Sequence, residues 1–263
     1  MNENASPLTP HASLKGLRVL VTRPTGQADN LCRMIEAGGG VAVRLPLLAI
    51  QPVFNPVVGK LFNDARNWHA WIFTSANAVQ HAAHLDRGEW PKKLAAVGAA
   101  TALALDHAGH PGALHPAGGA SAEALLRERE FMDVSEKKIL VVTGEDGSGT
   151  LLTSLRARGA QVQVAAVYRR VPLPYPPETV GEALRKINVL VITSGEAIAH
   201  LAQLTPEPAR ARLKALPLVV PSARVVEQAR QLGFEREPLV SDPMSDATIV
   251  RCLETLTPKA AAS

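Results

Sequence analysis

The chain contains an internal repeat. Residues 71–85, WIFTSANAVQHAAHL, are similar to residues 190–204, LVITSGEAIAHLAQL. Each copy begins as an apolar strand, turns at Thr-Ser, and continues as a helix with apolar periodicity. A further strand-turn-helix segment follows each copy, at residues 94–110 and 217–234, and corresponding segments are about 120 residues apart. The repeat predicts two similar α/β lobes with a cleft between them.

An opening βαβ unit is also present twice. The first unit covers residues 17–45 and its helix ends at a run of three glycines, whereas the second starts at Lys138 and its helix ends at Gly159. Glycine is a common helix terminator because it tolerates the left-handed backbone conformation. Each set of strands and helices is sufficient for a parallel sheet covered on both faces.

Two extended segments that end in proline, residues 46–52 and 166–172, follow the two opening units. They have the character of strands that cross from one lobe to the other. The residues by themselves allow two arrangements. The lobes either follow each other along the chain or exchange their opening units at these two crossover strands.

Length and composition limit the class of protein. A chain of 263 residues has room for two domains, and 46% hydrophobic and 20% charged residues are typical of a soluble globular protein. The formal charge of +4 favours an anionic ligand. Basic residues are scattered and no aromatic platform for bases is evident, so we expect no nucleic-acid partner.

Targeting signals and membrane spans are not evident. No apolar run is long enough to cross a bilayer, and residues 1–16 lack the features of a signal peptide. We therefore expect a cytoplasmic protein without a membrane partner, with terminal tails at residues 1–16 and 257–263. Cys32 and Cys252 lie in helical sequences and are expected to be buried free thiols.

Small and hydroxylated residues follow the predicted strands. In open α/β sheets, ligands bind beyond the carboxyl ends of the strands, where helix N-termini offer backbone N–H groups to anions. For any single turn, a plain helix N-cap is an alternative explanation. Helix capping alone does not explain why six such turns occur at matching places in the two lobes. They supply these candidate ligand-binding residues: Thr22, Arg23, Pro24, Thr74, Ser75, Ala76, Asn77, Gly98, Thr101, Gly144, Glu145, Ser194, Gly195, Glu196, Pro221, Ser222 and Arg224.

Other chemistries do not fit the pattern. The glycine-rich segment at residues 144–150 lacks the Lys-Ser/Thr of a phosphate-binding loop. The histidines form no metal-ligand pattern, and Ser75 and Ser194 lack the GxSxG context of a hydrolase. Tyr168, on the second crossover strand, is the candidate proton donor to a leaving group. A packing role for this tyrosine is the alternative.

These motifs together resemble the uroporphyrinogen-III synthase family. The resemblance covers residues 17–256 and depends on the order and spacing of motifs that are individually weak. Two turns depart from the family pattern, at residues 143–145 and 220–224. The motifs that carry the resemblance are residues 20–24, 72–79, 96–98 with Thr101, 167–169, 192–196 and 233–234.

The resemblance implies the fold and decides between the two arrangements. It implies two parallel-sheet α/β lobes, joined by a two-stranded β-ladder. One lobe is then discontinuous, residues 17–45 plus 172–256, and the other is residues 51–166.

The resemblance also implies the reaction. Linear hydroxymethylbilane loses its terminal hydroxyl group, and closure with inversion of ring D yields uroporphyrinogen III. No metal or organic cofactor is needed. We expect a monomer that contacts hydroxymethylbilane synthase transiently, with Tyr168 assisting departure of the hydroxyl. The alternative function is a two-lobed small-molecule binding protein or sensor, because fold alone does not fix function. A tandem receiver-like protein would need an acidic cluster after the first strand, which is missing here.

Overall fold

The computed structural model describes residues 13–63, 65–85, 89–117, 119, 121–147 and 149–257. Of the tails predicted at residues 1–16 and 257–263, residues 1–12 and 258–263 lie outside these ranges. The chain divides into two compact units, Met1–Ala49 with Pro172–Ser263 (unit 1) and Ile50–Val171 (unit 2). No helix of the described residues is both long and apolar enough to cross a membrane.

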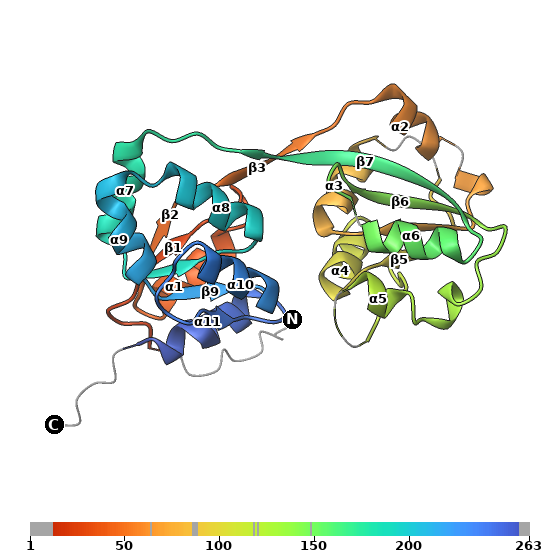
Figure 1. Cartoon of the computed structure of the whole chain (residues 1–263). Helices are drawn as coiled ribbons and strands as arrows, with labels where there is room; N and C mark the ends of the chain where they lie inside the picture. Colours follow the sequence, from red (N-terminus) through yellow and green to blue (C-terminus); the bar gives the residue numbers. More distant parts are fainter. Residues whose placement is uncertain are drawn as a thin grey trace, which may run out of the picture. The chain divides into compact units, whose positions relative to one another are not determined.

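Unit 1 has a five-stranded parallel sheet in the order β10-β9-β8-β1-β2. Two of its strands come from the start of the chain and three from its last third (Figure 1). Its strands are β1 (Arg18–Val21), β2 (Val41–Arg44), β8 (Val189–Val191), β9 (Leu218–Val220) and β10 (Leu239–Val240). Its helices are α1 (Asp29–Ala37), α7 (Pro177–Lys186), α8 (Gly195–Leu204), α9 (Glu207–Ala215), α10 (Ala223–Gln231) and α11 (Asp246–Thr255).

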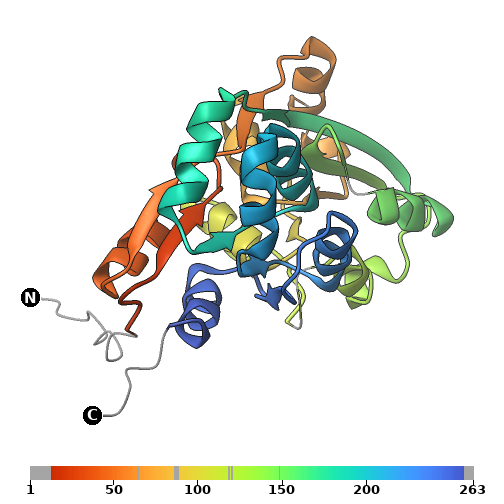
Figure 2. The ribbon, with the colours of Figure 1, turned by 60° about the vertical axis from the view of Figure 1, so that its left-hand side comes forward.

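Helices cover both faces of this sheet because its strands are apolar on both sides. Leu20 packs in a cluster with residues of α7, α8, α9 and α10, whereas Val19 and Val21 pack in a second cluster with α1 and α11. Alternate strand side chains point to opposite faces, so β1 contributes to both clusters. Figure 2 brings forward α7 and α9, which contact each other.

Unit 2 repeats the arrangement with the strand order β3-β7-β6-β4-β5. Strands β7, β6, β4 and β5 correspond in the repeat to β2, β1, β8 and β9 of unit 1, and the two sets have the same order in their sheets. Its strands are β3 (Leu48–Pro52), β4 (Ala70–Phe73), β5 (Leu94–Ala96), β6 (Lys138–Gly144) and β7 (Gln161–Pro172). Its helices are α2 (Pro56–Phe62), α3 (Ala76–Leu85), α4 (Ala99–His107), α5 (Ala122–Leu125) and α6 (Gly149–Ala157), with 3-10 turns η1 (Ala65–Asn67) and η2 (Arg129–Phe131).

The unit 2 sheet is likewise buried on both faces. Trp71 and Phe73 pack in one cluster with α2, α3 and α4, and Ile72 packs in the other with α5 and α6. The ring of Phe62 meets Trp71 edge-on, with centroids 5.1 Å apart. The predicted fold class, two parallel-sheet α/β lobes, is thereby confirmed.

The two cysteines differ in burial. Cys32 is buried in α1, as predicted, whereas Cys252 on α11 is partly exposed, so its predicted burial is wrong. Both thiols are free, and burial raises the pKa of each. Both helices cover the same face of the sheet, and the difference is that Cys32 lies within the buried stripe of α1 whereas Cys252 only borders the buried stripe of α11.

The strand order predicts how the chain behaves when it is cut. Residues 172–263 lack β1, whose neighbours in the sheet are β8 and β2, so we expect this fragment to show no cooperative unfolding by circular dichroism. Adding residues 1–49 should restore a cooperative transition, because β1 then fills the centre of the sheet. The continuous fragment 50–171 serves as the control and should unfold cooperatively alone. Cooperative melting of residues 172–263 without their partner would contradict this view.

Candidate active site

A hydroxyl pair lies at the carboxyl edge of the unit 2 sheet. Ser75 follows β4, and its Oγ accepts a hydrogen bond from the Ala78 N–H of α3 at 3.1 Å. The same Oγ is 3.1 Å from Oη of Tyr168, and either oxygen is able to donate the proton. A serine that caps a helix therefore also contacts the only tyrosine of β7.

A β-bulge brings Tyr168 to this position. In the ladder between β6 and β7, Thr143 lies opposite Ala166 but Gly144 lies opposite Tyr168, so Val167 is the extra residue. Val167 and Tyr168 consequently pack in the same apolar cluster, although consecutive residues of a regular strand point to opposite faces. Bulges of this kind re-aim a side chain.

Gly144 is required by the position of the tyrosine ring. A Cβ atom at residue 144 would lie 2.8 Å from Cζ and 2.9 Å from Cε2 of Tyr168. The backbone of this segment is also tied to β7, because the Glu145 N–H donates to the carbonyl of Tyr168 at 2.9 Å. The ring therefore lies directly against the backbone where β6 ends.

His81 of α3 lies against the other side of the same tyrosine. The two rings are stacked with centroids 5.8 Å apart. Burial, together with the nearby His84, lowers the pKa of His81. Its imidazole is thus neutral at pH 7, and it contributes a flat neutral surface rather than a positive charge beside the phenol.

Several predicted hydroxyl residues already have partners inside the protein. Thr74 Oγ1 donates to Thr143 Oγ1 at 2.8 Å, and Thr22 Oγ1 donates to the Val191 carbonyl at 2.9 Å. Thr22 and Thr101 are buried. These hydroxyls fix neighbouring strands and helix starts, so their backbone groups are better placed for a ligand than their side chains.

At the strand-end turns of unit 1, fewer side chains are hydrogen-bonded within the protein. Ser194 caps α8 by accepting from the Ala197 N–H at 3.1 Å, which matches the cap of Ser75 in α3. Ser222 is the N-cap of α10 without a side-chain hydrogen bond, and Arg224 in the first turn of this helix is exposed. Gln228 Nε2 donates to the Gly195 carbonyl at 2.8 Å and covers the start of α8.

Arg23 is engaged elsewhere in unit 1. Its guanidinium forms an ion pair with Asp246 at the start of α11, and both side chains are mostly buried. It also donates to the Met244 carbonyl at 3.3 Å, and Asn30 Nδ2 donates to the other oxygen of Asp246 at 2.6 Å. This network connects α1, α11 and the turn after β1, which is a structural use for the arginine.

The remaining predicted residues occupy the same strand-end turns. In unit 2, the structure brings Ser75, Gly144 and Tyr168 into direct contact. The others lie one to three residues from a strand end or within the first turn of a helix: Pro24, Ala76, Asn77, Gly98, Glu145, Glu196 and Pro221. His81 was not a candidate from the sequence, because a histidine on an amphipathic helix gives no signal of its partner.

Several helix N-termini lie at the carboxyl edges of the two sheets. Helices α3, α4, α8 and α10 begin three or four residues after a strand end, so their first N–H groups lie at the carboxyl edges of the sheets. Among the residues that the structure describes, no group of three His, Cys, Asp or Glu side chains is arranged to hold a metal ion.

Comparison with known proteins identifies the family. The family model described as uroporphyrinogen-III synthase HemD matches residues 29–247. This match covers most of the chain. The chain belongs to the uroporphyrinogen-III synthase family. The resemblance seen in the sequence motifs is therefore confirmed.

Individual relatives agree with this assignment. The chain is 29% identical over 252 residues to uroporphyrinogen-III synthase of Escherichia coli strain K12, covering 90% of this chain and 100% of that protein. The fold is similar to a mutant uroporphyrinogen III synthase of Thermus thermophilus, with a TM-score of 0.60, 18% identity and coverage of 92% of this chain and 99% of that one. The Helicobacter pylori 26695 enzyme gives a TM-score of 0.60 at 15% identity, covering 91% and 99%.

The family match includes the contact between Ser75 and Tyr168 and five of the six strand-end turns. The turn after β1, with Thr22, Arg23 and Pro24, precedes the matched region. In this uroporphyrinogen-III synthase family member, the mostly buried ion pair of Arg23 with Asp246 belongs to that unmatched turn.

Gly144 provides a test of how tightly the tyrosine is held. Gly144→Ala should destabilise the protein by about 1–3 kcal/mol, because the new methyl group overlaps a ring in a packed cluster. Gly149→Ala is the matched control, since a Cβ there meets nothing within 4 Å and the residue starts α6. Urea unfolding of both variants measures the difference. Equal stability would show that the ring of Tyr168 is free to move aside.

Proposed function

We propose that this chain cyclises hydroxymethylbilane, with loss of water and inversion of ring D, to give uroporphyrinogen III. The observation that carries the proposal is the family match over residues 29–247. The fold agrees with it, because two parallel α/β units of this kind also form the synthase structures to which the chain is similar. A two-lobed binding protein or sensor is not favoured, since the matched relatives are enzymes by name.

The substrate is a polycarboxylate, which fits the strand-end turns. Their helix N-termini offer backbone N–H groups, and charged acceptors strengthen such hydrogen bonds. The candidate binding residues of both units are assigned this role as a set, with Ser75, Gly98, Ser194 and Ser222 at helix N-caps. Many modest contacts would orient the chain of pyrroles so that closure at the wrong carbon of ring D is excluded.

Tyr168 is proposed to assist departure of the terminal hydroxyl group. Ser75 Oγ already accepts from Ala78, and its own proton is able to reach Tyr168 Oη, 3.1 Å away. In that arrangement the phenol keeps its proton for the leaving oxygen. No residue of the chain needs to carry an organic cofactor or a metal ion for this step.

The cellular setting is also proposed. We expect the chain to act as a monomer in the cytoplasm and to contact hydroxymethylbilane synthase transiently. A short-lived contact of this kind would limit spontaneous closure of the substrate before it is bound. Cross-linking of the two proteins during turnover, compared with the resting mixture, measures it.

The function is tested by product identity. The purified protein is supplied with hydroxymethylbilane, and the type I and type III products are separated after oxidation. Spontaneous closure gives type I, so formation of type III in proportion to added protein supports the proposal. Type I alone, from a protein with a cooperative thermal transition, would exclude synthase activity.

Tyr168→Phe tests the tyrosine. It should lower the single-turnover rate of type III formation about 100-fold, the low end for general-acid assistance, because the leaving group departs readily even without the enzyme. The melting temperature should stay close to that of wild type, since the ring and its packing are retained. Full activity in this variant would remove Tyr168 from the chemistry and leave positioning as the whole effect.

Ser75→Ala and Ser194→Ala form a matched pair. Each loses an N-cap bond of 3.1 Å, worth about 1 kcal/mol, so their losses of stability should be similar. Only Ser75 contacts the tyrosine, and its loss should lower kcat about fivefold, as for one hydrogen bond of about 1 kcal/mol. Ser194→Ala should keep kcat within about twofold.

A double variant separates the two roles of Ser75. In the Tyr168→Phe background, Ser75→Ala should cause no further loss of kcat, because the bond between them is already gone. If the effects of the two substitutions on the rate multiply, the serine acts through the substrate and not through the tyrosine.

A further inference from the structure

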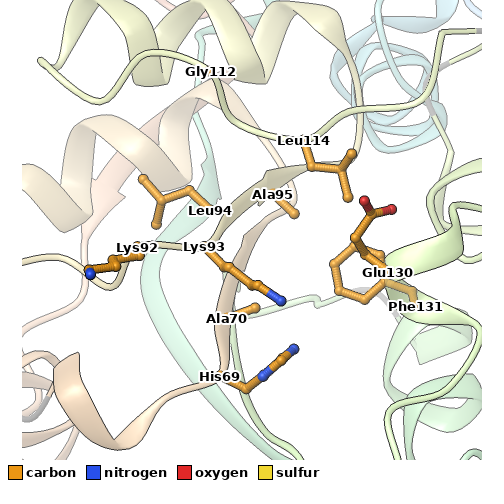
Figure 3. Close-up of a pocket in the computed structure, with 10 residues that line it drawn as sticks. All are labelled: His69, Ala70, Lys92, Lys93, Leu94, Ala95, Gly112, Leu114, Glu130 and Phe131. Carbon is orange, nitrogen blue, oxygen red and sulfur yellow. The ribbon is translucent and has the colours of Figure 1, made fainter.

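A pocket of about 310 Å³ lies at the amino-terminal edge of the unit 2 sheet (Figure 3). It forms where β4 and β5 begin, at the edge opposite to Ser75 and Tyr168. The segments after α4 and around η2 complete its wall. The lining residues are His69, Ala70, Lys92, Lys93, Leu94, Ala95, Gly112, Leu114, Glu130 and Phe131.

The pocket has an apolar floor and a polar rim. Ala95, Leu114 and Phe131 form part of the floor and belong to one apolar cluster, whereas the side chain of Leu94 packs on the other face of the sheet. Figure 3 shows Lys93 and His69 extending into the same space from one side, and the carboxylate of Glu130 on the other side. In the same view the side chain of the neighbouring Lys92 extends away from it.

Two nitrogen-bearing side chains of the rim lack partners within the described part of the chain. Neither Lys93 Nζ nor the His69 ring forms a hydrogen bond or an ion pair with any residue there. Lys137 is also close enough to act on His69, but its ammonium is held by the carbonyl of Asp133 at 2.5 Å. Lysines at such an edge often satisfy carbonyls at helix ends, and Lys137 satisfies a carbonyl in this unit. Lys93 does not: its exposed ammonium extends into the pocket, where it is available to pair with an anionic ligand.

The positive charges of Lys93 and Lys137 disfavour a further positive charge on the His69 ring. Burial, then Lys93 and Lys137, lower the pKa of His69. The ring is therefore neutral at pH 7 and offers one N–H donor, while Lys93 offers a full positive charge. The charged groups around this space are Lys92, Lys93, Lys137 and Glu130.

We infer that this pocket binds a small apolar monocarboxylate. The carboxylate lies between Lys93 and His69, and the hydrocarbon part lies on Ala95, Leu114 and Phe131. Glu130 on the opposite rim disfavours a second negative group, which distinguishes this ligand from the polycarboxylate proposed for the carboxyl edge. The site is separate from Ser75 and Tyr168, and it does not depend on the proposed reaction.

Benzoate is the probe, used with the full-length protein in NMR and calorimetric titrations. Benzoate should shift the resonances of His69 and Leu114 in a saturable way. Benzyl alcohol, which lacks the charge, and inorganic phosphate, which lacks the apolar part, should each bind at least fivefold more weakly. Lys93→Gln should weaken benzoate binding about tenfold, the loss expected for a hydrogen bond between charged groups.

Lys92→Gln is the matched control. It removes the same charge from the adjacent residue, and its affinity for benzoate should stay within about twofold of wild type. Glu130→Gln removes the repulsion and should bind benzoate more tightly, which provides a test even if Lys93→Gln does not fold. The inference is overturned if benzoate causes no saturable shifts, if phosphate binds as well, if both lysine variants lose affinity equally, or if Glu130→Gln weakens binding.

Discussion

The pairing of β1 with β8 is the contact on which unit 1 depends. Val19 lies opposite Val189, so two strands about 170 residues apart share the centre of one sheet. The Asn188 side chain strengthens the junction by accepting from the Arg18 N–H and donating to the Gly16 carbonyl, both at 2.7 Å. The entropy of closing a long loop rises only slowly with its length. A complete second unit is therefore tolerated between β2 and α7.

The repeat supplies a scaffold, and small departures from symmetry place a tyrosine at one sheet edge only. Ser75 and Ser194 cap equivalent helices with the same geometry. Only the unit 2 copy has a bulged neighbouring strand and a glycine that admits an aromatic ring. Three local features thus combine, namely the bulge at Val167, the missing side chain of Gly144 and the cap at Ser75. Together they hold one phenol at the sheet edge.

Sequence reasoning predicted the features that depend on periodicity. The repeat gave two α/β lobes, and the Thr-Ser turns were placed at strand ends where helices begin. It did not predict the bulge, because one extra residue in the pairing of two strands gives no recognisable pattern in the sequence of a 12-residue strand. It did not predict the ion pair of Arg23 with Asp246 either, because the two residues are 223 positions apart in the chain; the predicted ligand contact of Arg23 stays a prediction. Helices α7 and α9 were not predicted either, because they lie outside the repeated motif.

The two anion sites that we propose at the edges of the unit 2 sheet would act by different physical means. At the carboxyl edge, helix N-termini present N–H groups that carry only partial charges, so no single contact dominates. Such a surface suits a flexible polycarboxylate that must be bound, rearranged and released. At the amino edge, the helices that cover the sheet end rather than begin, and their ends bring partial negative charge. An anion at that edge needs a full side-chain charge to compensate, and Lys93 supplies it above an apolar floor. One parallel sheet therefore offers a dispersed anion surface at one edge and a compact, charge-dependent pocket at the other.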